Sequence, residues 1–101
     1  MEVTIPEIRV TIPRELRSLC ADSPRLKNGD LRLGAHSVRA LLAQLAREYP
    51  QVHVCVCDER GEPRQHINVF VNNDHVRMRA GLDTPLTAGD TVTILPAVSG
   101  G

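Results

Sequence analysis

The chain ends on two glycines, Gly100 and Gly101, directly after a strand-like and mostly apolar run over residues 91–99. Glycine has no Cβ, so two successive glycines form a backbone slim enough to enter a narrow active site of another protein. The last atoms of this chain are an α-carboxylate with no side chain beside it. A partner enzyme can therefore act on that carboxyl group itself. The alternative interpretation of the two glycines alone is a frayed terminus or the stub of a linker, since chain ends are commonly disordered.

A second group with possible chemistry lies between Val52 and Cys57. Valines alternate there with His53, Cys55 and Cys57, a pattern of period two that favours a strand. On a strand these three side chains would form a row on one face, with about 7 Å between neighbours. Such a row is a candidate zinc site, although zinc-binding cysteines usually sit on tight turns where the ligands converge. Reduced structural thiols are the favoured interpretation, and neither a metal site nor a catalytic residue is assigned.

Composition indicates one small globular domain. The chain has 101 residues, 42% of them hydrophobic, which is enough to form a core. Twelve basic residues balance twelve acidic ones, and this zero net charge argues against nucleic acid as a partner. No signal peptide and no apolar run of membrane-spanning length is visible, and the three cysteines form no disulfide framework. These features favour the cytoplasm and no membrane partner.

The elements that must position the glycine tail follow from hydrophobic periodicity. Ile8, Val10 and Ile12 alternate with polar residues as a first strand, and Leu31 to Leu33 form a second. After Ser37, a plausible N-cap, apolar residues recur at three- and four-residue spacing up to Pro50, which predicts an amphipathic helix. Further strands are expected at residues 52–57, 67–71 and 91–95.

One helix packed across one face of a mixed sheet is an α+β arrangement, and the β-grasp, or ubiquitin-like, fold has this order of elements. In that fold the first and last strands lie side by side in the centre of the sheet. The domain is expected to span residues 1–95, with residues 96–101 as a flexible tail.

Three stretches together resemble the MoaD/ThiS family of ubiquitin-like sulfur carrier proteins: Val69-Phe70-Val71-Asn72, the run from Gly89 to Pro96, and Ala97-Val98-Ser99-Gly100-Gly101. The ending is most similar to that of CysO-type members, which feed a cysteine-synthesis pathway. The similarity covers most of the chain and is specific mainly from Ile67 onward. Residues 14–36 depart from it, because they are longer than the tight hairpin of compact members.

The resemblance implies a mechanism in which this chain is a co-substrate and not an enzyme. A ubiquitin-activating-enzyme-like adenylyltransferase would use ATP to adenylate the Gly101 carboxylate, and a sulfur donor would then displace AMP and leave a thiocarboxylate. A sulfur-acceptor enzyme would receive that sulfur. The chain itself would hold no permanent cofactor. Some relatives carry residues after the glycines that a metalloprotease removes, so such a protease is a further expected partner.

The expected adenylation site is Gly101 with Gly100. Phe70 is expected to contact a partner, because it is a large ring on an otherwise polar strand face; an exposed or rim-packed ring without a partner is the alternative. The remaining expected partner-binding residues are Leu95, Pro96, Val98 and Ser99. Two other functions stay open: a ubiquitin-like modifier conjugated through Gly101, and a small subunit of a molybdopterin synthase-like complex.

Overall fold

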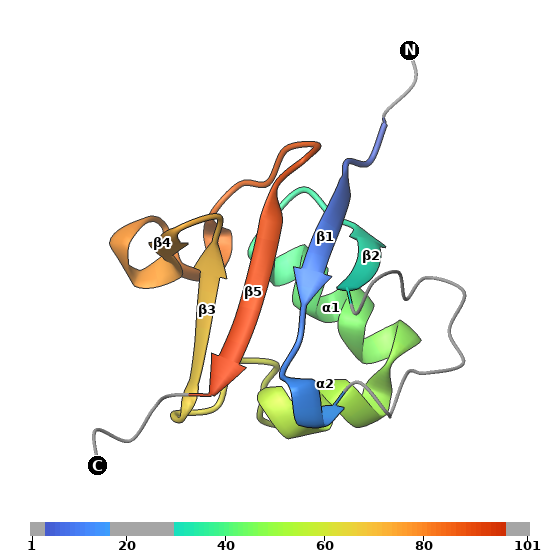
Figure 1. Cartoon of the computed structure of the whole chain (residues 1–101), viewed down its shortest axis with the longest axis vertical. Helices are drawn as coiled ribbons and strands as arrows, with labels where there is room; N and C mark the ends of the chain where they lie inside the picture. The colour runs from blue at the N-terminus through green and yellow to red at the C-terminus, as the bar shows by residue number, and fades with distance from the viewer. Residues whose placement is uncertain (1–3, 17–29, 97–101) are drawn as a thin grey trace.

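A computed structural model describes residues 4–16 and 30–96. Five strands and two α-helices make up the described part, together with short 3-10 turns at residues 14–16 and at η2 and η3 (Figure 1). In chain order they are β1 (Glu7–Thr11), β2 (Asp30–Gly34), α1 (Val38–Glu48), α2 (Pro50–Val56), β3 (Ile67–Val71), β4 (Asp74–His75), η2 (Val76–Met78), η3 (Gly81–Asp83) and β5 (Thr91–Pro96).

The strands form one mixed sheet in the order β2-β1-β5-β3-β4. The first and last strands pair in parallel at its centre, with Val10 opposite Val92, as the β-grasp expectation required. β1 also pairs with β2, and β5 with β3, both antiparallel. The end of β5 therefore lies beside the start of β3, at the end of the sheet near α2 (Figure 1).

The core lies between the sheet and helix α1, which covers one face of it (Figure 1). The alternating residues of the strands and the helical stripe of α1 are buried together, as the periodicity predicted: Ile8, Val10, Leu31, Leu33, Val38, Leu41, Leu42, Leu45, Val92 and Ile94. Ser37 is the N-cap of α1, since its Oγ accepts a hydrogen bond from the Ala40 amide at 3.1 Å. No helix in the described ranges is long and apolar enough to cross a membrane.

The strand expected at residues 52–57 is wrong, because Pro50 to Val56 form helix α2. Pro50 does not merely end α1: it occupies the first turn of a new helix, where its missing N–H costs nothing. Val52 and Val56 are four residues apart and both are buried, while Val54 is 59% exposed. Packing of that pair against the core outweighs the weak β-propensity of valine.

Candidate functional site

The sheet face that α1 does not cover is polar except at one corner. On this outer face, Asn68 of β3 pairs with Leu95 of β5, and Phe70 pairs with Thr93. Residues paired across antiparallel strands share a face, so Phe70 and Leu95 lie diagonally on the same surface. Leu95 is 42% exposed and Phe70 is half-buried. The predicted facing of Phe70 away from the core is confirmed, since Ile67, Val69 and Val71 are the buried members of β3.

The Phe70 ring is held in place by His75 of β4. The two rings meet edge to face, with centroids 5.2 Å apart. His75 Nδ1 accepts a hydrogen bond from the Arg77 amide at 3.0 Å, so its Nε2 carries the proton and donates to Asn68 Oδ1 at 3.1 Å. Phe70 is thus a preorganised, partly exposed ring. This support was not predicted, because only the β3–β4 register brings His75 opposite Phe70.

The apolar corner of this face is formed by Phe70 and Leu95, and Leu95 is the residue before the last one of β5. Pro96, expected as the first residue of the tail, is the last residue of β5 and pairs with Ile67. Proline donates no N–H, so it suits the final position of a strand ladder. Val98, Ser99, Gly100 and Gly101 lie outside the described residues. Of the expected partner-binding residues, Phe70, Leu95 and Pro96 are thus within the described part of the chain, and Leu95 and Pro96 are the last two residues of β5.

Hydrogen bonds made by the side chains of Asn72 and Asp90, together called the clamp, link the end of β3 to the start of β5. Asn72 has a positive φ of 55°, and its side chain donates to Asp90 Oδ1 at 3.2 Å and accepts from the Thr91 amide at 3.1 Å. Asp90 Oδ2 accepts from the Thr87 amide at 2.9 Å. The hydrogen bond from the Thr87 backbone is the largest cause that lowers the pKa of Asp90 below its ordinary value of 3.8. This clamp fixes the register that carries Leu95 to the corner.

Asp90→Asn is expected to lower the free energy of unfolding at pH 7 by about 1 kcal/mol, because the Thr87 amide loses a charged acceptor. The lowered pKa sets the pH dependence. Asp90 stabilises the fold above pH 3.8, the ordinary value, and this contribution disappears as the pH falls through the lower pKa of the folded state. Urea unfolding at pH 7 and pH 3 checks this: the difference between the two proteins should shrink at pH 3. An equal difference at both values would contradict the assignment.

The row of ligands expected from the strand at residues 52–57 does not form. Cys55 lies on helix α2 and is exposed, while Cys57, the residue that follows the helix, is buried, so the two thiols are in different environments. Among residues 4–16 and 30–96, no group of three His, Cys, Asp or Glu side chains is arranged to hold a metal ion. Burial, followed by the negative charge of Asp58, raises the pKa of the Cys57 thiol to about 11.

The thiols of Cys55 and Cys57 should therefore differ in reactivity. Cys57 is 1% exposed and protonated at neutral pH, and the thiolate is the reactive form. Alkylation of the native protein at pH 7.5 should modify Cys55 rapidly and Cys57 only after unfolding in denaturant. Peptide mass mapping after a short pulse of iodoacetamide distinguishes the two. Equal labelling of both residues in the native state would be incompatible with the described packing of α2.

Comparison with known proteins agrees with this architecture. The sulfur carrier protein CysO of Mycobacterium tuberculosis strain H37Rv is 32% identical over 96 residues, covering 93% of this chain and 98% of that protein. A chain in the crystal structure of the Amycolatopsis orientalis BexX/CysO complex superposes with a TM-score of 0.76 at 29% identity, covering 93% of this chain and 99% of that one.

Small archaeal modifier protein 1 of Methanosarcina acetivorans has a TM-score of 0.75 at 28% identity, covering 98% of this chain and 100% of that one. These neighbours confirm the ubiquitin-like β-grasp fold. The ThiS family profile matches residues 22–101. With that match, and with a relative 32% identical across nearly its whole length, the chain belongs to the ThiS family.

Proposed function

We propose that this protein is a sulfur carrier whose terminal Gly101 carboxyl group is converted to a thiocarboxylate. The observation that carries the proposal is the apolar corner, formed by Phe70 and Leu95: Leu95 is the last residue but one of β5, from which the chain continues to Gly100 and Gly101, and Phe70 lies diagonally from it on β3. Residues 96–101 span at most about 20 Å when extended. A partner that docks on the corner therefore has the tail within reach of its active site.

The chemistry needs activation because a carboxylate is a poor electrophile. The Gly101 carboxylate attacks the α-phosphorus of ATP, forming an acyl-adenylate and releasing pyrophosphate. A sulfide equivalent then attacks the acyl carbon, and AMP leaves with the electron pair of the C–O bond. The product is a thiocarboxylate, whose sulfur passes to an acceptor enzyme. ATP, the adenylyltransferase and the sulfur source belong to the partners, and this chain contributes the reacting carboxyl group.

Each residue of the proposed site has a separate part in this chemistry. Gly101 supplies the carboxyl group, and Gly100 keeps the preceding backbone slim. Pro96 stiffens the exit from the sheet, since its φ is restricted. Val98 and Ser99 contact the wall of the partner's channel. Phe70 and Leu95 supply the exposed apolar area on which the partner's body rests.

The relatives support a carrier that works with partner enzymes. Curated relatives across nearly the full length are CysO sulfur carrier proteins, and one structural neighbour was crystallised as a BexX/CysO complex. We also propose a cytoplasmic location, with a ubiquitin-activating-enzyme-like adenylyltransferase and a sulfur-acceptor enzyme as partners. Cysteine synthesis is the favoured destination of the sulfur, and a metalloprotease would act on any precursor with a longer tail.

Intact-mass measurement tests the carrier function directly. After incubation with the cognate adenylyltransferase, ATP and sulfide, the mass should rise by about 16 Da as sulfur replaces oxygen in the terminal carboxylate. A rise that maps to the C-terminal peptide supports the proposal. No rise, with a partner that is active on another carrier, would refute it.

A matched pair of surface substitutions tests whether the partner docks on the apolar corner. Leu95→Ser removes an aliphatic side chain that is 42% exposed at the corner, and Ile5→Ser removes one that is 55% exposed before β1. Adenylation at limiting partner concentration should slow about tenfold in Leu95→Ser, which corresponds to about 1.4 kcal/mol of docking energy. Ile5→Ser should react at the wild-type rate. Equal adenylation rates in the two variants and the wild type would show that Leu95 does not contribute to docking.

A ubiquitin-like modifier is the second candidate, favoured by the structural similarity to small archaeal modifier protein 1. Conjugation would use the same activated Gly101 carboxyl group, with a lysine amine of a target protein in place of sulfide as the nucleophile. Lysine-linked adducts in cell extracts that disappear when Gly101 is deleted would favour this function. Stable copurification with one larger chain would instead indicate a permanent small subunit.

A further inference from the structure

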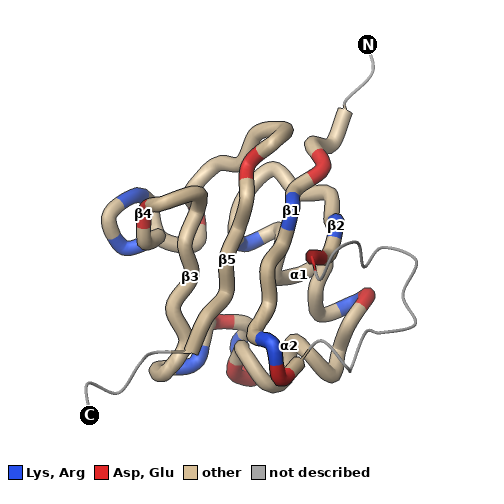
Figure 2. Tube along the Cα trace, viewed as in Figure 1, with Lys and Arg blue, Asp and Glu red and all other residues tan. Residues whose placement is uncertain are grey.

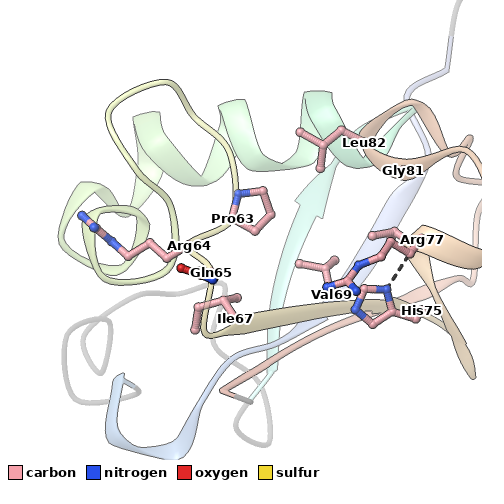
Figure 3. A pocket seen from close by; sticks show the side chains of 10 residues that line it. Pro63, Arg64, Gln65, Ile67, Val69, His75, Arg77, Gly81 and Leu82 are labelled. Atoms are coloured by element: carbon pink, nitrogen blue, oxygen red, sulfur yellow. Dashed lines mark hydrogen bonds between the residues drawn. The ribbon is translucent and has the colours of Figure 1, made fainter.

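The edge of the sheet beside β4 carries a pocket of about 270 Å³ that the proposed carrier chemistry does not use. Its apolar lining includes Ile67 and Val69 of β3, Val76 of η2, Leu82 of η3 and Pro63 from the loop after α2. Figure 3 shows Leu82 and Pro63 facing the β3 residues across this space. Ile67 and Val69 point to the core side of the sheet, so the pocket is on the opposite side of β3 from Phe70.

The pocket opens at the sheet edge because β4 is too short to cover it. β4 has two residues and pairs only with Phe70 and Val71 of β3. The preceding residues of β3, from Ile67 to Val69, extend beyond this pairing along the outer edge of the sheet. A short edge strand leaves backbone positions to which an extended segment of another chain can pair. The pocket lies directly beside those positions.

The rim of the pocket carries positive charge that no carboxylate in the described ranges neutralises. Arg64 and Arg77 both line the pocket, no acidic side chain does, and neither arginine has an ion pair within residues 4–16 and 30–96. Arg79, two residues from Arg77, is paired with Asp74 at 3.6 Å. Figure 2 shows the cluster of basic residues beside β4. In a chain with zero net charge, this local excess selects a negatively charged ligand.

The structure fixes the backbone at Arg77 and the side chain of Arg64. The Arg77 amide donates to His75 Nδ1, the dashed bond in Figure 3, and the Arg77 side chain lies beside Val69 and His75 in that view. Arg64 Nε donates to the Val54 carbonyl of α2 at 3.1 Å, and in Figure 3 the Arg64 side chain points away from the pocket, so Arg77 is the cation that faces a ligand there. Neither bond uses the terminal guanidinium nitrogens, which remain able to bind carboxylate oxygens in a two-pronged geometry.

We propose that this pocket and the adjoining edge of β3 bind an extended acidic-aliphatic segment of a partner protein. One aliphatic side chain of about leucine size would enter the pocket, and an aspartate or glutamate next to it would pair with Arg77. The backbone of the segment would run along Ile67–Val69 and pair at Val69, because the Ile67 amide already donates to the Arg64 carbonyl at 2.8 Å. An extended peptide fits better than a compact ligand, because the apolar cavity is small and continues into an open strand edge. The pocket does not include Gly101, Phe70 or Leu95, although His75 both lines it and contacts the Phe70 ring.

Selection of peptides on the full chain tests the proposal. A display library of random hexapeptides should yield binders that combine one or more aliphatic residues with an adjacent Asp or Glu. The selected peptide, titrated into ¹⁵N-labelled protein, should shift the backbone amides of Ile67–Val69, Val76 and Arg77 and leave those of β2 unchanged. A library without binders, a consensus without acidic residues, or shifts confined to Phe70 and Leu95 would each overturn the proposal.

Two neighbouring arginines provide the matched control. Arg77→Glu should weaken binding of the selected peptide by about tenfold or more, because it places a negative charge at the rim of the pocket. Arg79→Glu makes the same change of charge two residues away, at a side chain that does not line the pocket, and should weaken binding by less than about threefold. Equal weakening in the two variants would reduce the effect to general electrostatics and refute a defined site.

Blocking the pocket from its surface provides a second variant that does not depend on charge. Gln65 is an exposed residue of the lining, so Gln65→Trp can fill the mouth without disturbing the core. This variant should lose binding of the selected peptide while keeping the wild-type unfolding midpoint. Retained binding with full affinity would show that the peptide does not enter the pocket, and would overturn the proposal.

Discussion

Gly101→Ala is expected to reduce formation of the thiocarboxylate by about 100-fold or more, the scale of loss when a reacting group is displaced by about 1 Å. The substitution adds a Cβ next to the carboxyl group that must reach the α-phosphorus of ATP inside a partner's narrow channel. Rates of pyrophosphate release with the cognate adenylyltransferase measure the first step, and intact mass measures the product.

This experiment has two controls: the unfolding midpoint of Gly101→Ala, and the activity of a variant with a substitution elsewhere in the tail. Gly101 lies five residues beyond the end of β5, so the variant should keep the unfolding midpoint of the wild-type domain. Ser99→Ala, which shortens a side chain and adds no bulk beside the carboxyl group, should lose no more than about threefold in rate, because Ser99 is placed at the channel wall and not at the reacting group. Gly101→Ala activity at the wild-type rate would count against the terminal carboxyl group as the site of chemistry.

Leu45→Asp is expected to unfold the domain at neutral pH. Leu45 is 1% exposed in the middle of the apolar stripe of α1, so a carboxylate there would be buried without a partner. The effective cost of burying an unpaired charge is several kcal/mol, and deletion of the leucine side chain adds about 2–5 kcal/mol. Together these approach or exceed the 5–15 kcal/mol that stabilises a typical domain.

Ala43→Asp is the matched control, because Ala43 is an exposed residue of the same helix. This change introduces the same charge with the same loss of helix propensity, about 0.7 kcal/mol or less. Circular dichroism and urea unfolding should show a folded Ala43→Asp protein with a slightly lowered midpoint, while Leu45→Asp lacks a cooperative transition. A cooperative transition in Leu45→Asp near the wild-type midpoint would contradict the assignment of α1 to the core.

Elements with a clear hydrophobic period could be predicted from the sequence. Alternation placed Ile8 and Val10 of β1, and Val92 and Ile94 of β5, on the buried face, and the stripe of α1 with its Ser37 cap was confirmed. These positions follow from the sequence because each side chain in a strand or helix has a direction fixed by the period of that element. The order of elements and the terminal glycines also indicated the β-grasp fold and the carrier family from the sequence alone.

At helix α2 the secondary structure predicted from the local sequence pattern was wrong. Its alternating valines favour a strand, and only burial of Val52 and Val56 against the core selects the helix. The helical path removes the row of His53, Cys55 and Cys57 on which a zinc site would depend. A signal was present in Pro50, which suits the first turn of a helix as well as the end of one.

The sequence by itself indicated the carrier family, the residues that line the core and the terminal glycines as the proposed reactive end, because these depend on neighbours along the chain. Only the tertiary structure decided which surfaces surround them. The support of Phe70 by His75 and the pocket between Val69, Arg77 and Leu82 arise from segments that strand pairing and turns bring together. Such sites depend on register and on the packing of distant segments, and a one-residue change of register would remove them.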